Sequence, residues 1–461
     1  MTTVETITRT LVFRKQKVNG NVGYGYSPIE YLNDRAKIIE IDGIRALMEV
    51  EGPNVVSFIL TPFSAGRPSP ETFPFSSITL SLKSPLGLSG SANTVPELVT
   101  IEGPDLDTAL QYGLPAGLPK LCNWLADLQS HVHKKDKNEF AISLGSGSQD
   151  LMYKAFFAVL NPGDPILVDT PVYAGILPAL RSLKAEMIEV EVDEHGSSAQ
   201  NLEKALREWP ADKKRPKVFY CSPVGSNPTG CSVPRQRKLQ VLQVCRKYGI
   251  MIFEDDPYYY LATEHIPSYF ALEKEVFSES GHVVRFDSFS KLLSAGLRLG
   301  WATGPKEILR AIDVKTAEAN LHTSTVSQGI ALRLMQHWGI DGFLNHCHAV
   351  ANLYAQRRER FEAVAHKYLD GLAKWVSPVA GMFLWIDLSP SGIQDSYELI
   401  RHEALAKGVL GVPGKSFYPT GRKSHHVRLS FSVIDLGEET ELGFSRLVEA
   451  IKENKEFTGL A

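Results

Sequence analysis

The chain has 461 residues, of which 43% are hydrophobic and 22% are charged, a composition typical of a globular protein of about two to three domains. Its net charge of -3 argues against a nucleic-acid partner or an acidic membrane surface, and it has no apolar run of about 18 residues that could span a membrane. The five cysteines are scattered and odd in number, which favours a reduced compartment, and we expect a cytoplasmic protein.

Residues 1–45 are polar and irregular, and we expect them to form an N-terminal arm. They lack the apolar core of a secretion signal, although their threonines and basic residues leave an organelle-targeting segment open. The density of Gly and Pro in residues 64–75 excludes a long helix there. We expect a large domain over residues 106–345 and a small domain built from residues 46–105 and 346–461.

From residue 139 on, apolar strand-like runs alternate with helical patterns. The segment 139–160 combines a short apolar strand, a glycine turn and a helix with one apolar face. Another helix is predicted over 236–249. This alternation predicts an α/β fold with a mostly parallel sheet that is covered by helices on both faces. The further strands of this sheet are predicted at 165–169, 187–192, 217–221, 249–255 and 283–290.

The C-terminal part follows a different pattern. Residues 306–338 could hold a long helix with one break, and another helix follows after about residue 345. Two apolar strands, at 381–388 and 426–432, come after these helices. Together they predict a smaller α+β domain.

Polar motifs follow the predicted strands at their carboxyl ends, where open parallel sheets bind their ligands. Residues 145–149, GSGSQ, lead from a strand into a helix, and the free N–H groups of that helix start could bind a phosphate. A tight turn before a capped helix explains this motif about equally well. Asn227, in the turn SNPTG at 226–230, adds an amide at the same edge of the sheet.

Two aspartates, Asp255 and Asp256, end the apolar strand at 249–255, and Tyr258 comes three residues after the first. A buried carboxylate needs a cationic partner. Because no lysine or arginine lies near these aspartates in the sequence, that partner is either distant in the chain or a ligand.

Lys291 stands in the apolar stretch FDSFSKLLSAGLRLGW, residues 286–301, although lysine is almost never fully buried unless it is paired or used. Ser288 and Ser290 project on one face before it, and Arg298 follows, a residue type that binds phosphate through its forked guanidinium. A lysine amine forms Schiff bases with carbonyls. Together with a carboxylate that faces a pyridine nitrogen, such a lysine describes a site for pyridoxal phosphate.

The order and spacing of SGSQ, NPTG, DDPYY and SFSK resemble those of the fold-type I pyridoxal-phosphate aminotransferases, over about residues 60–435. Finer motifs, such as AGRPSPETFPF at 65–75 and HHVRLSFS at 425–432, are similar to the subgroup of fungal aromatic aminotransferases and kynurenine/2-aminoadipate aminotransferases. The resemblance implies the type I transferase fold, pyridoxal 5'-phosphate as cofactor, and a homodimer that acts on amino acids and 2-oxo acids.

The resemblance also implies roles for single residues. Lys291 is expected to bind the cofactor covalently and to move the proton at the substrate α-carbon. Asp255, with Asp256 as the alternative, is expected to keep the pyridine nitrogen protonated, while Tyr258 and Asn227 contact the phenolic oxygen. The other implied cofactor-binding residues are Gly147, Ser148, Gln149, Ser288, Ser290 and Arg298 at the phosphate, Tyr173 on the pyridine face, and Tyr112 from the neighbouring subunit.

Arg428 lies on a predicted strand among apolar residues, where an arginine needs a carboxylate. The resemblance implies that it binds the substrate α-carboxylate, with Asn227 beside it; a structural ion pair is the alternative. Gly66 resembles part of the segment that covers the substrate in this family.

The implied reaction moves the amino group of an aromatic amino acid to 2-oxoglutarate by a ping-pong mechanism through pyridoxamine phosphate. A 2-aminoadipate or kynurenine aminotransferase, and a β-lyase or decarboxylase with the same cofactor, remain alternatives. A cofactor-sensing domain of a transcription regulator is disfavoured, because the residues before about 60 show no helix-turn-helix pattern and no basic excess. No carboxylate or cysteine cluster accompanies the histidine pairs 425/426 and 346/348, so we expect no metal.

Overall fold

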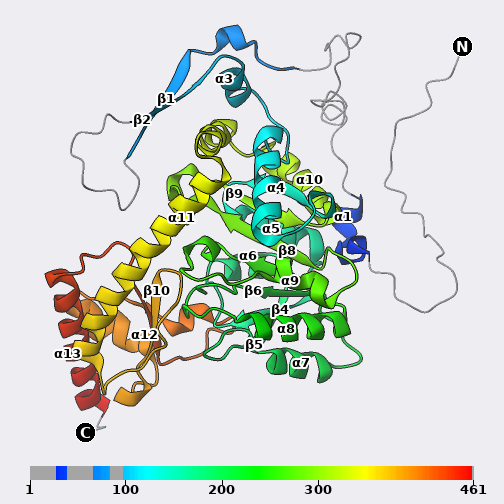
Figure 1. The fold of residues 1–461 in the computed structure, drawn as a ribbon. Helices are drawn as coiled ribbons and strands as arrows, with labels where there is room; N and C mark the ends of the chain where they lie inside the picture. The colour runs from blue at the N-terminus through cyan, green and yellow to red at the C-terminus, as the bar shows by residue number, and fades with distance from the viewer. Residues whose placement is uncertain (1–26, 39–65, 84–96, 459–461) are drawn as a thin grey trace, which may run out of the picture.

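The computed structural model describes residues 27–38, 66–83 and 97–458 (Figure 1). Its largest element is a seven-stranded sheet in which β9 alone runs against its two neighbours. Along the sheet the strands follow in the order β3 (Ala141–Gly145), β9 (Gly300–Gly304), β8 (Val283–Ser288), β7 (Met251–Asp255), β6 (Val218–Cys221), β4 (Pro165–Thr170) and β5 (Glu186–Glu191).

Helices cover both faces of this sheet, and each face has its own apolar core. Strands β4 and β8 are buried along their whole length, as expected of a largely parallel sheet with two covered faces. The predicted α/β architecture is confirmed. One face carries α5 (Ser148–Val159), α6 (Ile176–Ser182) and α10 (Lys306–Asn320); the other carries α4 (Pro119–His133), α7 (Ala199–Arg207), α8 (Arg235–Tyr248), α9 (Tyr269–Val276) and part of α11 (Thr325–Leu369).

The long helical region has one break within residues 306–338, as the sequence predicts, and a kink just beyond them. Helix α10 ends at Asn320, and α11 begins after Ser324, whose hydroxyl accepts the backbone N–H of Ser327 as an N-cap. Within α11, Gly339 has φ 65° and ψ -178°, so two helices meet there at a kink. The second helix, which the sequence places after about residue 345, therefore begins at this kink and runs to Leu369.

The C-terminal part forms a second, smaller core. Strands β10 (Phe383–Asp387), β12 (His426–Ser430) and β11 (Val412–Pro413) make an antiparallel sheet, and α13 (Glu438–Thr458) packs on α11 beside it. This confirms the predicted α+β character. A separate pair, β1 (Ser77–Leu82) and β2 (Glu97–Glu102), lies with α3 (Gly103–Leu110) at the top of Figure 1 against α11. The exact domain boundaries stay a prediction.

The strand ends position the polar motifs. Strands β3, β6, β7 and β8 end at Gly145, Cys221, Asp255 and Ser288, and these ends lie at one edge of the sheet because the strands point the same way. The turn between β8 and β9 contains Lys291. Among the described residues, no helix is both long enough and apolar enough to cross a membrane.

Candidate active site

The turn between β3 and α5 brings three chain segments close together. Gly147 has φ 90°, a conformation that favours glycine, and the next residue, Ser148, starts α5. A Cβ at Gly147 would lie 2.4 Å from Nη2 of Arg298, and a Cβ at Gly300 would lie 2.7 Å from the backbone N of Ser148. Only glycine fits this approach, and the first N–H groups of a helix have no partner within it, so the turn can hold an anion.

Arg298 connects this turn to the segment that follows β8. It has φ 48°, and its Nη1 donates to Ser290 Oγ at 3.2 Å and to the Ala295 carbonyl at 3.0 Å, while Nη2 donates to the Ser146 carbonyl at 3.2 Å. Within the described ranges no carboxylate pairs with it. No carboxylate therefore offsets the positive charge of this guanidinium beside the start of α5, as a phosphate site requires.

Lys291 lies half-buried at the end of a single 3-10 turn that follows β8. Burial lowers the pKa of its amine, Arg298 lowers it further, and Asp255 acts in the opposite direction. In the part of the chain that the structure describes, its Nζ has no hydrogen-bond or ion-pair partner. A half-buried, unpaired amine with a lowered pKa has the properties of a lysine that reacts with carbonyl groups.

Asp255 ends β7 with a carboxylate that is only half satisfied. Its Oδ2 accepts a hydrogen bond from the hydroxyl of Tyr220 at 2.6 Å, but its buried Oδ1 has no partner. Burial raises the pKa of this carboxyl to about 7, and the hydrogen bond from Tyr220 acts against this shift. A buried acceptor without a donor is costly, so Oδ1 fits a ligand that brings an N–H group, such as a protonated pyridine.

The neighbouring Asp256 has a different environment. It forms a buried ion pair with Arg285 at 2.8 Å, and the same guanidinium binds Asp287 at 2.8 Å and lies 3.4 Å from Glu254. Asp256 is thus turned toward a cation that sequence reasoning missed. The signal was present, because Arg285 stands within an apolar strand two residues before Asp287.

Arg428, Asn227 and Tyr258 form one polar group. Nη1 of Arg428 donates to Oδ1 of Asn227 at 2.7 Å, and Asn227 also lies close enough to the hydroxyl of Tyr258 to lower its pKa, which burial raises. The guanidinium lies 4.1 Å above the ring of Phe383 and 5.2 Å from that of Phe417. Its Nε is buried without a partner, and no carboxylate of the described residues pairs with it. This arginine fits an incoming carboxylate.

Tyr173 lies in the loop after β4, where the charges of Asp255 and Arg428 act on its hydroxyl. Burial raises the pKa of its hydroxyl and Asp255 raises it further, while Arg428 lowers it. A Cβ at Gly175 would lie 2.4 Å from the Tyr173 hydroxyl, so the ring packs back across this glycine. Gln149 holds the same loop, because its Nε2 donates to the Gly175 carbonyl at 2.7 Å, while its Oε1 is buried without a partner.

Two predicted site residues lie apart from this group. Tyr112 is 50% exposed and makes an edge contact with His322, with ring centroids 6.0 Å apart. Gly66 is exposed at the start of a described segment that Gln111 holds by donating to the Pro68 carbonyl at 2.9 Å. Among the described residues, no hydrogen bond or ring contact connects either one to Lys291 or Arg428. Their roles remain predictions.

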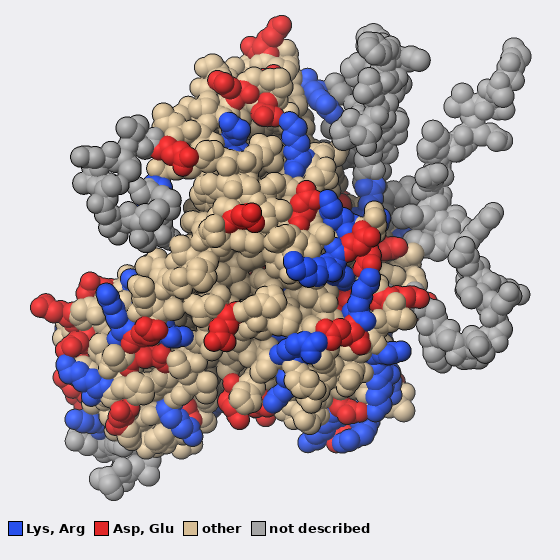
Figure 2. Space-filling model, viewed as in Figure 1, with Lys and Arg blue, Asp and Glu red and all other residues tan. Residues whose placement is uncertain are grey.

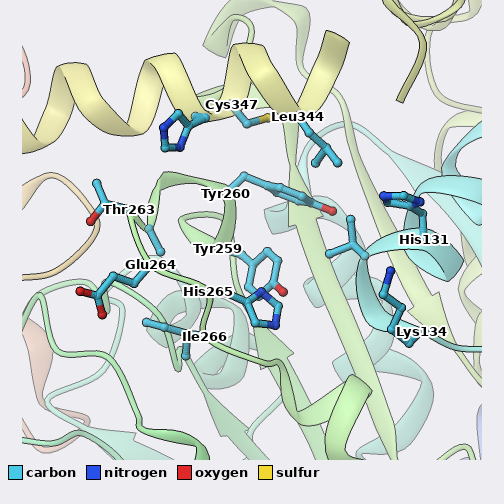
Figure 3. Close-up of a pocket in the computed structure, with 13 residues that line it drawn as sticks. His131, Lys134, Tyr259, Tyr260, Thr263, Glu264, His265, Ile266, Leu344 and Cys347 are labelled. Atoms are coloured by element: carbon cyan, nitrogen blue, oxygen red, sulfur yellow. The ribbon is translucent and has the colours of Figure 1, made fainter. Parts of the chain in front are cut away.

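A cavity of about 440 Å³ lies on another side of the segment that contains Tyr258 (Figure 3). Tyr259 and Tyr260 face it, together with His131 of α4, Lys134 directly after that helix, and Cys347 of α11. None of the predicted site residues lines this cavity. It is therefore separate from the group around Lys291.

The residues at the sheet edge fit pyridoxal phosphate. The turn at Gly147 with Arg298 and Ser290 fits its phosphate, the unpaired Oδ1 of Asp255 fits its ring nitrogen, and the unpaired amine of Lys291 fits its aldehyde. Ser288 supports this arrangement, because its hydroxyl accepts the backbone N–H of Ser290 at 3.1 Å. The geometry thus agrees with the cofactor that the resemblance implies.

Comparisons with known proteins agree with this arrangement. The family model of class I and II aminotransferases matches residues 78–441. The aminotransferase tdiD of Emericella nidulans is 40% identical over 88% of this chain and 92% of its own length. The mitochondrial kynurenine/alpha-aminoadipate aminotransferase of Bos taurus is 36% identical over 89% of this chain and 96% of its own length.

Solved structures have the same fold. The aromatic aminotransferase Aro9 of C. albicans superposes with a TM-score of 0.81 over 94% of this chain and 99% of its own, at 24% identity. The kynurenine aminotransferase of Pyrococcus horikoshii, solved in complex with PMP, superposes with a TM-score of 0.69 over 76% of this chain and 84% of its own, at 31% identity. The predicted fold class is confirmed.

Proposed function

Because this chain belongs to the class I and II aminotransferases, which depend on pyridoxal phosphate, we propose that it moves the amino group of an aromatic amino acid to 2-oxoglutarate by a ping-pong mechanism. The observation that carries this proposal is Arg428, a guanidinium without a carboxylate partner among the described residues, which lies against the rings of Phe383 and Phe417. One such cation serves one α-carboxylate at a time, so donor and acceptor bind in turn.

Separate residues of this chain bind the substrate and move its proton. Arg428 and Asn227 bind and orient the substrate carboxylate, since a fixed guanidinium fork holds it in one geometry. Lys291 is the general base that would remove the proton from the substrate α-carbon and return it at C4′ of the cofactor, and its lowered pKa leaves more of the amine neutral. Pyridoxal phosphate, when bound, supplies the electron-accepting ring that makes this proton acidic.

The remaining groups hold the cofactor in place. Gly147, Ser148 and Gln149 with Ser288, Ser290 and Arg298 would bind the phosphate, and Asp255 would accept the ring N–H. Tyr258 and Asn227 would bind the phenolic oxygen, and Tyr173 would lie on the ring face. Gly66 would belong to the segment that covers the substrate.

The substrate class rests on two kinds of support. Aromatic rings surround Arg428, and relatives from Schizosaccharomyces pombe and Thermococcus litoralis, 30% and 29% identical, are named aromatic amino acid aminotransferases. The runner-up is a kynurenine or 2-aminoadipate donor, which the name of the bovine relative favours. A β-lyase or decarboxylase would keep the same residues around the cofactor but would need no oxo acid.

An absorption experiment tests the proposal. The cofactor-loaded protein is mixed with single amino acids, and its visible band should bleach with Phe, Tyr or Trp and return on addition of 2-oxoglutarate. Bleaching with 2-aminoadipate or kynurenine alone selects the runner-up. Product formation without any oxo acid would identify a lyase, and an unchanged spectrum in Lys291→Ala and wild type alike would contradict the role of Lys291.

We further propose a cytoplasmic homodimer in which Tyr112 reaches the phosphate of the neighbouring subunit. Its half-exposed ring supports this role, because a side chain that serves another subunit has to be accessible in the single chain. The five cysteines, which are all free, agree with a reduced compartment. Cell fractionation decides between the cytoplasm and the mitochondrion that the bovine relative's name gives.

A further inference from the structure

The histidine pair at the start of β12 has a carboxylate neighbour that the sequence does not reveal. Asp387, at the end of β10, is paired in register with His426, and Nε2 of His425 lies 3.3 Å from Oδ1 of Asp387. One ligand atom of each of the three side chains lies within 4.8 Å of the others. In a tetrahedral site with bonds of about 2.0–2.2 Å, ligand atoms are separated by about 3.5 Å, a spacing that lies within the 4.8 Å limit of this cluster and close to the 3.3 Å between His425 and Asp387.

The surroundings hold two of these three side chains in place. The carboxylate of Asp387 accepts the backbone N–H of Ser389 at 2.8 Å. The ring of His426 stacks on Trp385, with centroids 4.9 Å apart and an angle of 8°, and its Nδ1 lies 3.4 Å from the hydroxyl of Ser424. A second-sphere partner on one ring nitrogen leaves the other nitrogen to face a metal, as in known metal sites.

This group opens into a cavity. His426, Asp387 and Trp385 line a cavity of about 500 Å³, and Glu191 and Asp193 also line it. A metal bound here would keep an open coordination position toward the cavity.

We propose that Asp387, His425 and His426 form a binding site for a divalent transition-metal ion of the Zn²⁺ class, which prefers imidazole nitrogen and carboxylate oxygen. The site joins the end of β10 to the start of β12, two residues before Arg428 on the same strand. Lys374, 3.3 Å from Oδ2 of Asp387, is the group that the metal displaces, and its 69% exposed side chain can move into solvent.

Calorimetric titration of Zn²⁺ into the cofactor-loaded full chain tests this site. The variants are His425→Gln, His426→Gln and Asp387→Asn, and each should weaken binding of one equivalent by about 100-fold or more, since loss of even an outer-sphere partner costs about 10- to 100-fold. His366→Gln is the matched control, because His366 pairs with Asp370 at 2.8 Å in the same way but lies outside the cluster. Unfolding curves without metal verify that the variants fold.

Cys231 provides a second control, because it lines the same cavity and thiols also bind zinc. Burial raises the pKa of its thiol, so we expect Cys231→Ser to bind Zn²⁺ like wild type. Stoichiometric binding in wild type, His366→Gln and Cys231→Ser, with loss in the three ligand variants, supports the site. No binding in wild type, equal binding in all variants, or loss in Cys231→Ser overturns it.

Discussion

Asp255 and Asp256 are adjacent in the chain, yet their carboxylates have different partners. Asp256 pairs with the cation Arg285, whereas Asp255 accepts only from the neutral hydroxyl of Tyr220; Oδ1 of each carboxylate is buried without a donor. We expect Asp255→Asn to lower kcat by about 10- to 100-fold, because a hydrogen bond to a charged group contributes about 1.5–3 kcal/mol. Steady-state kinetics with a saturating aromatic amino acid measure this loss.

Asp256→Asn is the matched control for that variant. Because it removes one of the buried partners of Arg285, we expect it to lower the free energy of unfolding by about 1–3 kcal/mol with a smaller effect on kcat. Chemical denaturation measures this change. If folded Asp256→Asn loses more activity than Asp255→Asn, the ring contact belongs to Asp256.

Asp255 also gives the cofactor-free chain a pH-dependent stability. Its pKa is about 7 in the folded chain, above the value of about 3.9 expected for an unfolded one. Between these values the unfolded chain has lost a proton that the folded chain keeps, so Asp255 destabilises the fold by about 1.4 kcal/mol more per pH unit as pH rises. Asp255→Asn lacks this contribution. Its unfolding free energy relative to wild type should therefore grow from pH 5 to pH 7, and a constant difference contradicts the assignment.

Arg428 should determine substrate affinity rather than the rate of proton transfer. We expect Arg428→Gln to raise KM for the amino acid by about 10- to 100-fold with a smaller change in kcat, because it removes the charge-assisted bonds to the carboxylate. Arg422→Gln is the control, since Arg422 pairs with Glu191 at 2.9 Å on the surface. Equal effects on KM in both variants would remove Arg428 from the substrate site.

At the scale of elements, the sequence predicts the strands and turns, because hydrophobic periodicity and turn residues indicate them directly. The apolar runs before Gly145, Cys221 and Asp255 are strands, and the polar residues after them meet at one edge. Strand β9 was missed because GWATG is rich in glycine and alanine, which weaken the strand signal; its pairing with β3 and β8 comes from tertiary packing.

Contacts between segments that are distant in the chain could not be predicted from the sequence either. Arg285 beside Asp256, and Asp387 beside His425, lie 29 and 38 residues apart in the chain, so no local pattern reports them. Tyr220, the donor to Asp255, lies on β6, whereas Asp255 ends β7. Only the order of the strands in the sheet brings such residues together, which is why the site's residue types were predictable and these partners were not.

The close backbone contacts at Gly147 and Gly300, between the β3–α5 turn and β9, allow a test of the phosphate site. Ala at Gly147 would collide with the flexible guanidinium of Arg298, whereas Ala at Gly300 would collide with the backbone N of Ser148, which cannot move away alone. We expect both variants to weaken binding of pyridoxal phosphate by about tenfold or more, Gly300→Ala more strongly, because the phosphate site loses its geometry. Fluorescence titration of the cofactor-free chain measures this affinity.

Gly163→Ala separates backbone strain from damage to the site. Gly163 has φ 85°, close to the 90° of Gly147, but a Cβ there meets nothing within 4 Å. It should lower stability while leaving cofactor affinity as in wild type. If Gly163→Ala weakens cofactor binding as much as Gly147→Ala does, the loss arises from general destabilisation and the phosphate site is not at this turn.

On the scale of the whole molecule, surface features favour assembly. Figure 2 shows Lys and Arg side chains interspersed with Asp and Glu over much of the visible face, and sparse charge over its middle. The pair β1 and β2 stands away from the main sheet. Leu98 on β2 is 63% exposed, and Tyr112, which follows α3, is 50% exposed. Apolar side chains on such a projection are expected to be covered by a second copy.

Mixed dimers decide whether Tyr112 serves the neighbouring subunit. Lys291→Ala and Tyr112→Ala chains are co-expressed with different tags, and the doubly tagged dimer is isolated. If Tyr112 reaches across, the site that contains the intact Lys291 receives its tyrosine from the other chain, so this dimer regains about half of the wild-type kcat per dimer while both parent dimers stay impaired. If Tyr112 serves its own subunit, the intact Lys291 and the missing tyrosine share one site, and no activity returns.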